Sequence, residues 1–395
     1  MASDAIYELV KTSGRARLGK LTTSHGVVAT PAFMPVATQG SVKTLTTDEV
    51  GDLGAQILLA NAYHLYLQPG VDVVKGLGGL HTFCRWDKPI LTDSGGFQAY
   101  SLGSGSKVSD DGITFRSHID GSSHYLTPES AVDHQVHLGV DVAMCLDQCI
   151  AFEASREQVK HAMDRTHRWA ERSKAAHELR AAPEQYLFGI VQGGLYADLR
   201  RESAEAITSL DFHGYAVGGL GVGEAKGPMY EVAELTTGML PPSRPRYLMG
   251  VGSPEDLVEG VASGIDLFDC ALPTRVARNG SLFTAEGRVD ITHRRFQGAT
   301  GPVEEGCDCY GCQRFSAGYV RHLFKAREIL GLCLATLHNL RFILRLMESI
   351  RAAIEVDGFD AFRTSFHGSY VPTDQEARLE QKKRWVANRG IPTDC

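Results

Sequence analysis

Residues 90–98 read ILTDSGGFQ, an apolar run that ends in a carboxylate, a hydroxyl and two glycines. Residues 265–271 repeat the arrangement as IDLFDCA, in which Asp269 follows Leu267 and Phe268. A short apolar run of this kind is typical of a buried parallel strand. Polar residues directly after such strands form the active sites of α/β barrels. The two stretches therefore predict a parallel barrel with carboxylates at one of its mouths.

Similar apolar runs recur along the chain, separated by segments with helical periodicity. The segments 155–179 and 195–210 are amphipathic, and the second is expected to expose a charged face that includes Arg200. The alternation predicts an α/β fold, a (β/α)8 TIM barrel of about eight strands. The predicted strands are 27–34, 56–60, 90–92, 140–146, 187–191, 215–217, 246–248 and 265–268.

Two segments depart from this alternation. Residues 101–125 are rich in Gly and Ser and predict an inserted β-hairpin region. Residues 315–354 have a long helical pattern, broken near Gly331, after a cysteine cluster. We therefore divide the chain into a barrel at 1–280 with an insertion near 100–126, a helical subdomain at 281–370 that carries the cysteine cluster and packs on the barrel, and a charged, solvent-facing tail at 371–395.

Composition and charge narrow the class of protein. The 395 residues are 43% hydrophobic and 22% charged, as in globular proteins, and suffice for two average domains or one large barrel. No apolar run approaches the length of a membrane span, and the first residues lack a secretory signal, so we expect a soluble, cytoplasmic protein. The net charge of −7 means that a polyanion would have to meet a local basic patch.

The cysteine cluster predicts a metal site. Cys307, Cys309 and Cys312, followed by His338, offer three thiolates and an imidazole, which is a complete tetrahedral set for Zn²⁺. The polar turn between the cysteines argues against three buried thiols that meet by chance. Four protein ligands leave no open position for water, so we expect one structural zinc ion per subunit.

Asp93 and Asp269 are the candidate catalytic residues. Taken alone, either could be a turn or helix-capping aspartate. Together at one mouth they can act as nucleophile and as acid/base, the division used when glycosidic bonds are broken with retention. Asp147, Gln192 and the backbone at 218–220 add donors and acceptors that could read the edge of a flat heterocycle.

Six motifs, taken in order, resemble the tRNA-guanine transglycosylases, the bacterial-type queuine tRNA-ribosyltransferases. The motifs are NAYHL at 61–65, TDSGGFQ at 92–98, YAVGGL at 215–220, YLMGVG at 247–252, FDCALPTR at 268–275, and the cysteine cluster with His338. The resemblance runs from about residue 6 to about residue 368. It implies a homodimeric pentosyltransferase with a zinc subdomain on its barrel. Such an enzyme replaces the wobble guanine of the tRNAs for Asp, Asn, His and Tyr with preQ1 (7-aminomethyl-7-deazaguanine), a step of queuosine biosynthesis.

The resemblance also assigns roles. Asp269 would attack C1′ of the ribose to form a covalent enzyme–tRNA intermediate, and Asp93 would be the proton acceptor, with Asn61 orienting it. Arg275 and Arg278 would meet the backbone of the anticodon loop, or else form surface salt bridges. The free deazaguanine base would be held by a set of residues that also includes Asn61: Ser94, Phe97, Asp147, Cys149, Gln192, Gly219, Leu220 and Met249.

The expected choice between preQ1 and queuine rests on two residues. Cys149 and Val222 follow the bacterial pattern and favour preQ1, whereas glycine in place of Val222 would make room for the larger base queuine. Gln148, Gly221 and Ser253 depart from common bacterial residues, which bears on fine specificity.

Three alternatives remain open from the sequence. One is a queuine-incorporating member of the family. Another is a retaining nucleoside or glycoside hydrolase on the same barrel, in which water resolves the intermediate. The third is a non-catalytic RNA-binding subunit, which the presence of both Asp93 and Asp269 disfavours.

Overall fold

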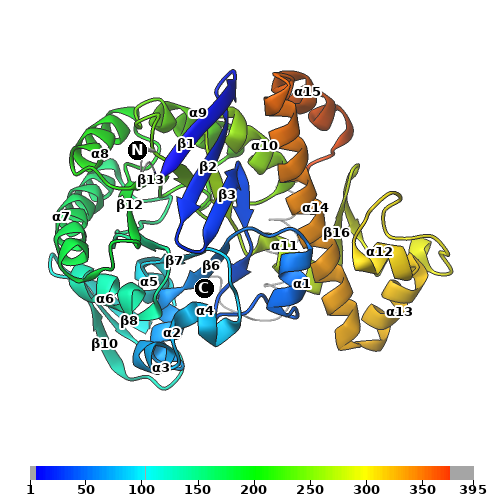
Figure 1. Cartoon of the computed structure of the whole chain (residues 1–395), viewed down its shortest axis with the longest axis horizontal. Helices are drawn as coiled ribbons and strands as arrows, with labels where there is room; N and C mark the ends of the chain where they lie inside the picture. Colours follow the sequence, from blue (N-terminus) through cyan, green and yellow to red (C-terminus); the bar gives the residue numbers. More distant parts are fainter. Residues whose placement is uncertain (1–5, 103, 374–395) are drawn as a thin grey trace.

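The computed structural model describes residues 6–102 and 104–373, and a closed parallel barrel forms its centre (Figure 1). Within these residues the barrel sheet has nine strands in the order β4-β15-β14-β13-β12-β11-β7-β6-β5. β4 (Ala32–Met34) and β5 (Val36–Ala37) are separated only by Pro35, which has no N–H to donate to a ladder. β4 pairs with β15 and β5 pairs with β6, so the two edges of the sheet belong to one strand position and the barrel closes. The predicted (β/α)8 barrel is confirmed.

The other barrel strands lie where apolar runs were predicted, and some are shorter and some longer than predicted. They are β6 (Leu58–Asn61), β7 (Ile90–Asp93), β11 (Val142–Met144), β12 (Tyr186–Val191), β13 (Gly214–Val217), β14 (Arg246–Leu248) and β15 (Leu267–Asp269). All are parallel to their neighbours and buried along most of their length, because helices cover the outside and side chains fill the inside.

Helices follow the strands and form the outer layer, with α7 to α10 prominent in Figure 1. α7 begins after Ser155, which forms a capping box with Gln158, so the predicted start of this helix is confirmed. The helices up to residue 278 are α1 (Thr47–Asp52), α2 (Ala62–Leu67), α3 (Val71–Gly76), α4 (Gly79–Cys84), α5 (Gly96–Ser101), α6 (Pro128–Leu138), α7 (Arg156–Arg180), α8 (Ala197–Ser209), α9 (Lys226–Thr237), α10 (Pro254–Ala262) and α11 (Leu272–Arg278).

The prediction of a charged face on α8 is wrong for Arg200. Asp198 and Glu202 do lie near the surface, where they pair with Arg156 and Lys160. Arg200 is instead completely buried, with 0% of its surface exposed. The periodic pattern cannot distinguish the two positions, because a guanidinium that finds enough backbone acceptors can lie inside the protein.

The predicted strand 27–34 is wrong as a single strand. Pro31 interrupts it: β3 (Gly26–Thr30) belongs to an antiparallel sheet with β1 (Tyr7–Ser13) and β2 (Ala16–Thr23), and the barrel strand starts at Ala32. This antiparallel sheet was not predicted from the sequence. Its side chains and backbone bond to residues just before β6, β11 and β15, so it covers the barrel end opposite the carboxylates.

The inserted region after α5 is confirmed and holds three antiparallel strands rather than a two-stranded hairpin. They are β8 (Ser104–Val108), β9 (Ile113–Arg116) and β10 (Ser123–Leu126). The additional strand is β8, whose Gly- and Ser-rich sequence SGSKV shows no alternation of apolar side chains.

The C-terminal part is helical, as predicted, and packs on the barrel through α14. α14 contacts α11 and the strands β1, β2 and β4, and runs between the barrel and α12 and α13 in Figure 1. The elements are β16 (Ser281–Thr284), β17 (Gly287–Asp290), η1 (Arg294–Phe296), α12 (Tyr310–Arg314), α13 (Ala317–Ala326), α14 (Ile329–Glu355) and α15 (Phe359–Ser369). The predicted tail at 371–395 lies outside the described residues from position 374 onward.

The break in the long helical pattern lies slightly before the predicted position. α13 ends at Arg327, which has a left-handed backbone with φ of 59°, and Gly331 lies within the first turn of α14. α14 is long and apolar enough to cross a membrane by composition, yet 67% of that window is buried inside the protein. It is therefore the central helix of the C-terminal region.

Candidate active site and metal centre

The exits of the barrel strands converge on a cavity of about 390 Å³. Polar side chains reach it from β7 and β15 and from the loop after β11, while glycine backbone reaches it from the loop after β13. This convergence follows from the barrel, since the carboxyl ends of parallel strands meet at one mouth. Of the predicted site residues, the cavity is lined by Asp93, Ser94, Phe97, Asp147, Cys149, Gly219, Leu220, Met249, Asp269 and Arg275.

Asp93 ends β7 and is held by three donors. Asn61, its neighbour across the ladder at the end of β6, donates its side-chain amide to Oδ2. Gln98 donates to the same oxygen at 3.1 Å, and the Ala62 N–H donates to Oδ1 at 3.1 Å. Burial raises the pKa of Asp93 to about 7, and the nearby carboxylate of Asp269 adds to the increase. A carboxyl with this pKa can both give and take a proton near neutral pH.

Asp269 ends β15 and is 9% exposed. The Tyr247 hydroxyl donates to its Oδ1 at 2.6 Å and the Gly250 N–H donates to the same atom at 2.7 Å. Burial raises the pKa of this carboxyl, while the two hydrogen bonds oppose that increase. Among the described residues no hydrogen bond reaches Oδ2, so this oxygen keeps its lone pairs for another partner.

Asp147 and Gln192 form a linked pair at another wall of the cavity. The Gln192 amide donates to Asp147 Oδ2 at 2.6 Å, and the Cys149 thiol donates to the same oxygen at 3.6 Å. Burial raises the pKa of Asp147. Gln192 reaches this site through Asp147 and does not itself line the cavity.

Only glycine fits at position 219, beside the Asp147–Gln192 wall of the cavity. Its φ is 66°, in the left-handed region, and a Cβ there would lie 2.5 Å from Oε1 of Gln192. The backbone of the loop after β13 can therefore approach a ligand at close range.

A second cavity, of about 270 Å³, lies beside the first. Gly219 and Val222 line both cavities, and Gln192 lines the second. The second cavity is otherwise lined largely by apolar side chains, among them Ile150, Phe152, Val159, Met163, Leu195 and Tyr196. Val222 thus stands between two spaces.

The two predicted RNA-binding arginines differ in position. Arg275 is exposed at the rim of the cavity, on α11 just after Asp269. Arg278 does not line the cavity, is partly buried, and has an Nη1 atom without a hydrogen-bond partner. Within the described residues neither forms an ion pair, so the alternative of surface salt bridging receives no support.

Gln98, Tyr247 and Gly250 had no role predicted from the sequence, although each donates a hydrogen bond to Asp93 or Asp269. All three stand inside motifs that were noticed, TDSGGFQ and YLMGVG. Their signal was therefore present, but only the fold shows that each donor points at an aspartate.

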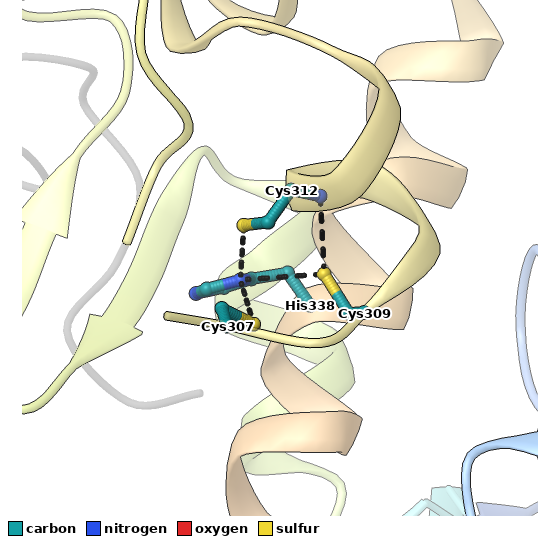
Figure 2. Close-up of side chains that lie close together, drawn as sticks. All are labelled: Cys307, Cys309, Cys312 and His338. Atoms are coloured by element: carbon teal, nitrogen blue, oxygen red, sulfur yellow. Dashed lines mark hydrogen bonds between the residues drawn. The ribbon is translucent and has the colours of Figure 1, made fainter. Parts of the chain in front are cut away.

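The cysteine cluster forms a closed ligand set, as Figure 2 shows. The Sγ atoms of Cys307, Cys309 and Cys312 lie 3.6, 3.7 and 3.3 Å from Nδ1 of His338. Sulfur and nitrogen ligands of one tetrahedral Zn²⁺ are separated by roughly 3.5 Å, given bonds of about 2.3 and about 2.0 Å. The donor set and its spacing therefore fit a metal ion.

Neighbouring groups orient these ligands. His338 Nε2 donates to the Phe283 carbonyl at 2.6 Å, which leaves the Nδ1 lone pair to face the sulfurs. Asp308, within the cysteine loop, accepts two hydrogen bonds from Arg341 of α14, at 2.8 and 2.7 Å. The cysteine loop is thereby fixed to the helix that carries the histidine.

The family model and the relatives that match this chain all carry the same name. The family described as queuine tRNA-ribosyltransferase matches residues 12–372. A queuine tRNA-ribosyltransferase of Dehalococcoides mccartyi is 51% identical over 388 residues, which cover 98% of each chain. Proteins of the same name from Herpetosiphon aurantiacus and Symbiobacterium thermophilum are each 55% identical, over 356 residues (90% of each chain) and 375 residues (94% of this chain, 93% of the relative).

Proposed function

The chain belongs to the queuine tRNA-ribosyltransferase family, the tRNA-guanine transglycosylases, and on this premise we propose that it inserts preQ1 into tRNA. It would replace the guanine at the wobble position of the tRNAs for Asp, Asn, His and Tyr, through a covalent intermediate. The observation that carries this proposal is the pair of buried carboxylates, Asp93 and Asp269, in one cavity with different hydrogen-bond partners.

The chemistry follows from these partners. Oδ2 of Asp269 attacks C1′ of the ribose, the bond from C1′ to N9 of guanine breaks, and the departing base takes a proton from Asp93. Incoming preQ1 then gives its N9 proton to Asp93, and N9 attacks C1′. The ester bond to Asp269 breaks and the carboxylate is regenerated. Two inversions retain the configuration at C1′.

The base is held by the wall of the cavity that Asp147, Gln192 and the loop after β13 form. Asp147 accepts from the N–H groups of the pyrimidine ring, and Gln192 with the backbone of Gly219 and Leu220 reads the remaining polar edge. Met249 and Phe97 cover the faces of the ring, while Ser94 and Cys149 complete the wall. Arg275 and Arg278 bind phosphates of the anticodon loop, a local positive patch on a protein with a net charge of −7.

Val222 supports preQ1 over queuine. Its side chain stands between the cavity of about 390 Å³ and the second cavity of about 270 Å³. A small aminomethyl group needs no more than the first space. The bulky substituent of queuine would need the second.

Cys307, Cys309, Cys312 and His338 would hold one Zn²⁺ per subunit. With four protein ligands the ion would cross-link the cysteine loop to α14 and take no part in the reaction. The active assembly would be a homodimer, in the cytoplasm, where the tRNA is modified.

An exchange assay tests the function. Purified protein is incubated with labelled guanine and a guanine-first tRNA, then with unlabelled preQ1 or queuine, beside a tRNA that lacks the wobble guanine. The proposal expects label only in the guanine-first tRNA and its removal by preQ1 but not by queuine.

The other outcomes each favour a different function. Removal of the label by queuine would point to the queuine-incorporating alternative. Irreversible release of guanine without incorporation would indicate a hydrolase. Binding of the tRNA without any exchange would indicate a non-catalytic subunit.

A further inference from the structure

Arg200 projects from α8 into the protein interior and is 0% exposed. Among the described residues its guanidinium forms no ion pair with a carboxylate, and burial lowers its pKa to about 9. The negative charge of Glu224 opposes this lowering of the pKa without forming an ion pair with Arg200. A buried charge that has no ion pair is costly unless its donors are satisfied. The cost of burying Arg200 must therefore be offset by its hydrogen bonds.

The guanidinium is bonded to three backbone carbonyls. Nε donates to Gly194 at 2.8 Å, Nη1 to Val191 at 2.9 Å and Nη2 to Gly218 at 2.8 Å. The rigid fork of an arginine can meet three acceptors at fixed angles, whereas the single ammonium of a lysine cannot.

Each carbonyl lies close in sequence to a residue of the proposed base site. Val191 ends β12 and precedes Gln192, and Gly218 follows β13 and precedes Gly219. The Val191 carbonyl also accepts the Gly218 N–H at 3.0 Å. One side chain thus joins the two strand exits that carry Gln192 and Gly219.

α8 also contacts the loop after β12 at a second point. Ser203 Oγ accepts the Gln192 N–H at 3.0 Å. At Gly193 a Cβ would lie 2.8 Å from the Arg200 N–H nitrogen, so this loop is pressed against the start of α8. The position of the Gln192 backbone is therefore set by α8.

We propose that Arg200 is a positioning residue for the base site, the wall that carries Gln192 and Gly219. It fixes the separation between Gln192 and Gly219, and thereby the affinity for the free base, without contacting the base itself. The inference rests on the proposed function, since it assumes that this wall binds a purine-like ring.

Arg246 offers a matched control. It is also buried, at 9% exposure, and donates to the backbone carbonyls of Leu240 and Gly264 at 3.0 and 3.4 Å. It starts β14, however, and so lies at the opposite end of the barrel from the cavity. Its loss should affect stability alone.

The experiment compares Arg200→Met, Arg200→Lys and Arg246→Met as full-length, metal-loaded proteins. Binding of free guanine is measured by calorimetry, and KM for guanine and KM for tRNA are measured by exchange. Arg200→Met should weaken guanine binding and raise KM for guanine about tenfold or more, because the wall loses its cross-link. KM for tRNA should change by less than about threefold, because phosphate contacts dominate tRNA affinity.

The remaining variants decide between positioning and stability. Arg200→Lys should recover part of the guanine affinity, and Arg246→Met should lower the thermal midpoint while leaving guanine binding unchanged. Unchanged guanine binding in folded Arg200→Met would overturn the proposal, as would failure of both Arg200 variants to fold. If wild-type protein bound guanine but never incorporated it, the proposed function would fail, while the binding comparison would still test Arg200.

Discussion

At the residue scale, Asp93 and Asp269 are both buried carboxyls, and their hydrogen bonds set them apart. Asp93 receives two side-chain amides and one backbone N–H, and its pKa is raised to about 7. Asp269 receives a hydroxyl and a backbone N–H on one oxygen only. The first suits proton transfer and the second suits nucleophilic attack.

This difference predicts a pH dependence. Because Asp93 must carry a proton when guanine leaves, kcat/KM for tRNA should fall as the pH rises above about 7. Gln98 donates to the charged carboxylate and lowers its pKa, so Gln98→Leu should raise the pKa and move this alkaline limb up by as much as about one pH unit.

Tyr100→Phe, on the same helix but without a contact to Asp93, serves as the control for pH–rate profiles. An alkaline limb that stays in place in Gln98→Leu would show that another group titrates there.

Val222 makes a second residue-scale prediction. Val222→Gly should join the two cavities and allow queuine to displace labelled guanine, while preQ1 is still accepted. Val222→Ala, which shortens the side chain without removing it, should have an intermediate effect. Rejection of queuine by the glycine variant would place the specificity elsewhere.

The sequence predicted some single residues of the candidate site well. Asp93, Asp147 and Asp269 could be selected because each follows an apolar run, and all three line one cavity. Arg200 could not be selected, because an arginine among charged helix residues looks exposed until the carbonyls that surround it are known.

At the element scale, the cysteine loop and α14 act as one unit. Asn339, next to His338, donates to the Pro273 carbonyl of α11 and the Ser281 carbonyl of β16, both at 3.0 Å. α11 follows Asp269 and carries Arg275. The cysteine–histidine ligand set is therefore connected to the helix that follows Asp269.

Removal of one ligand tests this unit. Cys309→Ser should abolish the bound metal and cost about 4 kcal/mol or more of unfolding free energy, because a closed metal site stabilises the fold that presents it. Cys333→Ser, on α14 with His338 but outside the ligand set, should keep the metal and change stability by about 1 kcal/mol at most. Metal analysis and thermal unfolding measure both, and equal stability of the two variants would refute the structural role.

Element boundaries were less predictable than element types. The apolar run at 27–34 was predicted as one strand although it contains Pro31, and the run is in fact divided between two sheets at that proline. The break between α13 and α14 falls at Arg327, whose left-handed backbone has no sequence signature of the kind that glycine gives. At this second boundary tertiary packing, rather than local propensity, decides where the helix ends.

At the scale of the whole molecule, closure of the barrel brings residues from distant parts of the chain into one site. Asp93 and Asp269 are 176 positions apart in sequence (269 minus 93) yet line the same cavity, because the pairing of β4 with β15 and of β5 with β6 closes the sheet. The alternation of strands and helices predicted parallel strands joined by crossover helices, and the family resemblance implied that they close into an eight-stranded barrel. The sheet of β1, β2 and β3 over the other end was not predicted, since nothing in its composition separates it from a barrel strand.

The most direct test of the central claim is a search for the covalent intermediate. Wild-type protein and Asp269→Asn are incubated with a guanine-first tRNA without any free base, denatured, and separated by electrophoresis. A protein–tRNA adduct in the wild type that is absent from Asp269→Asn, with tRNA binding preserved in both, is the result expected. An adduct that persists in Asp269→Asn, or base exchange that proceeds in that variant at the wild-type rate, would contradict the account.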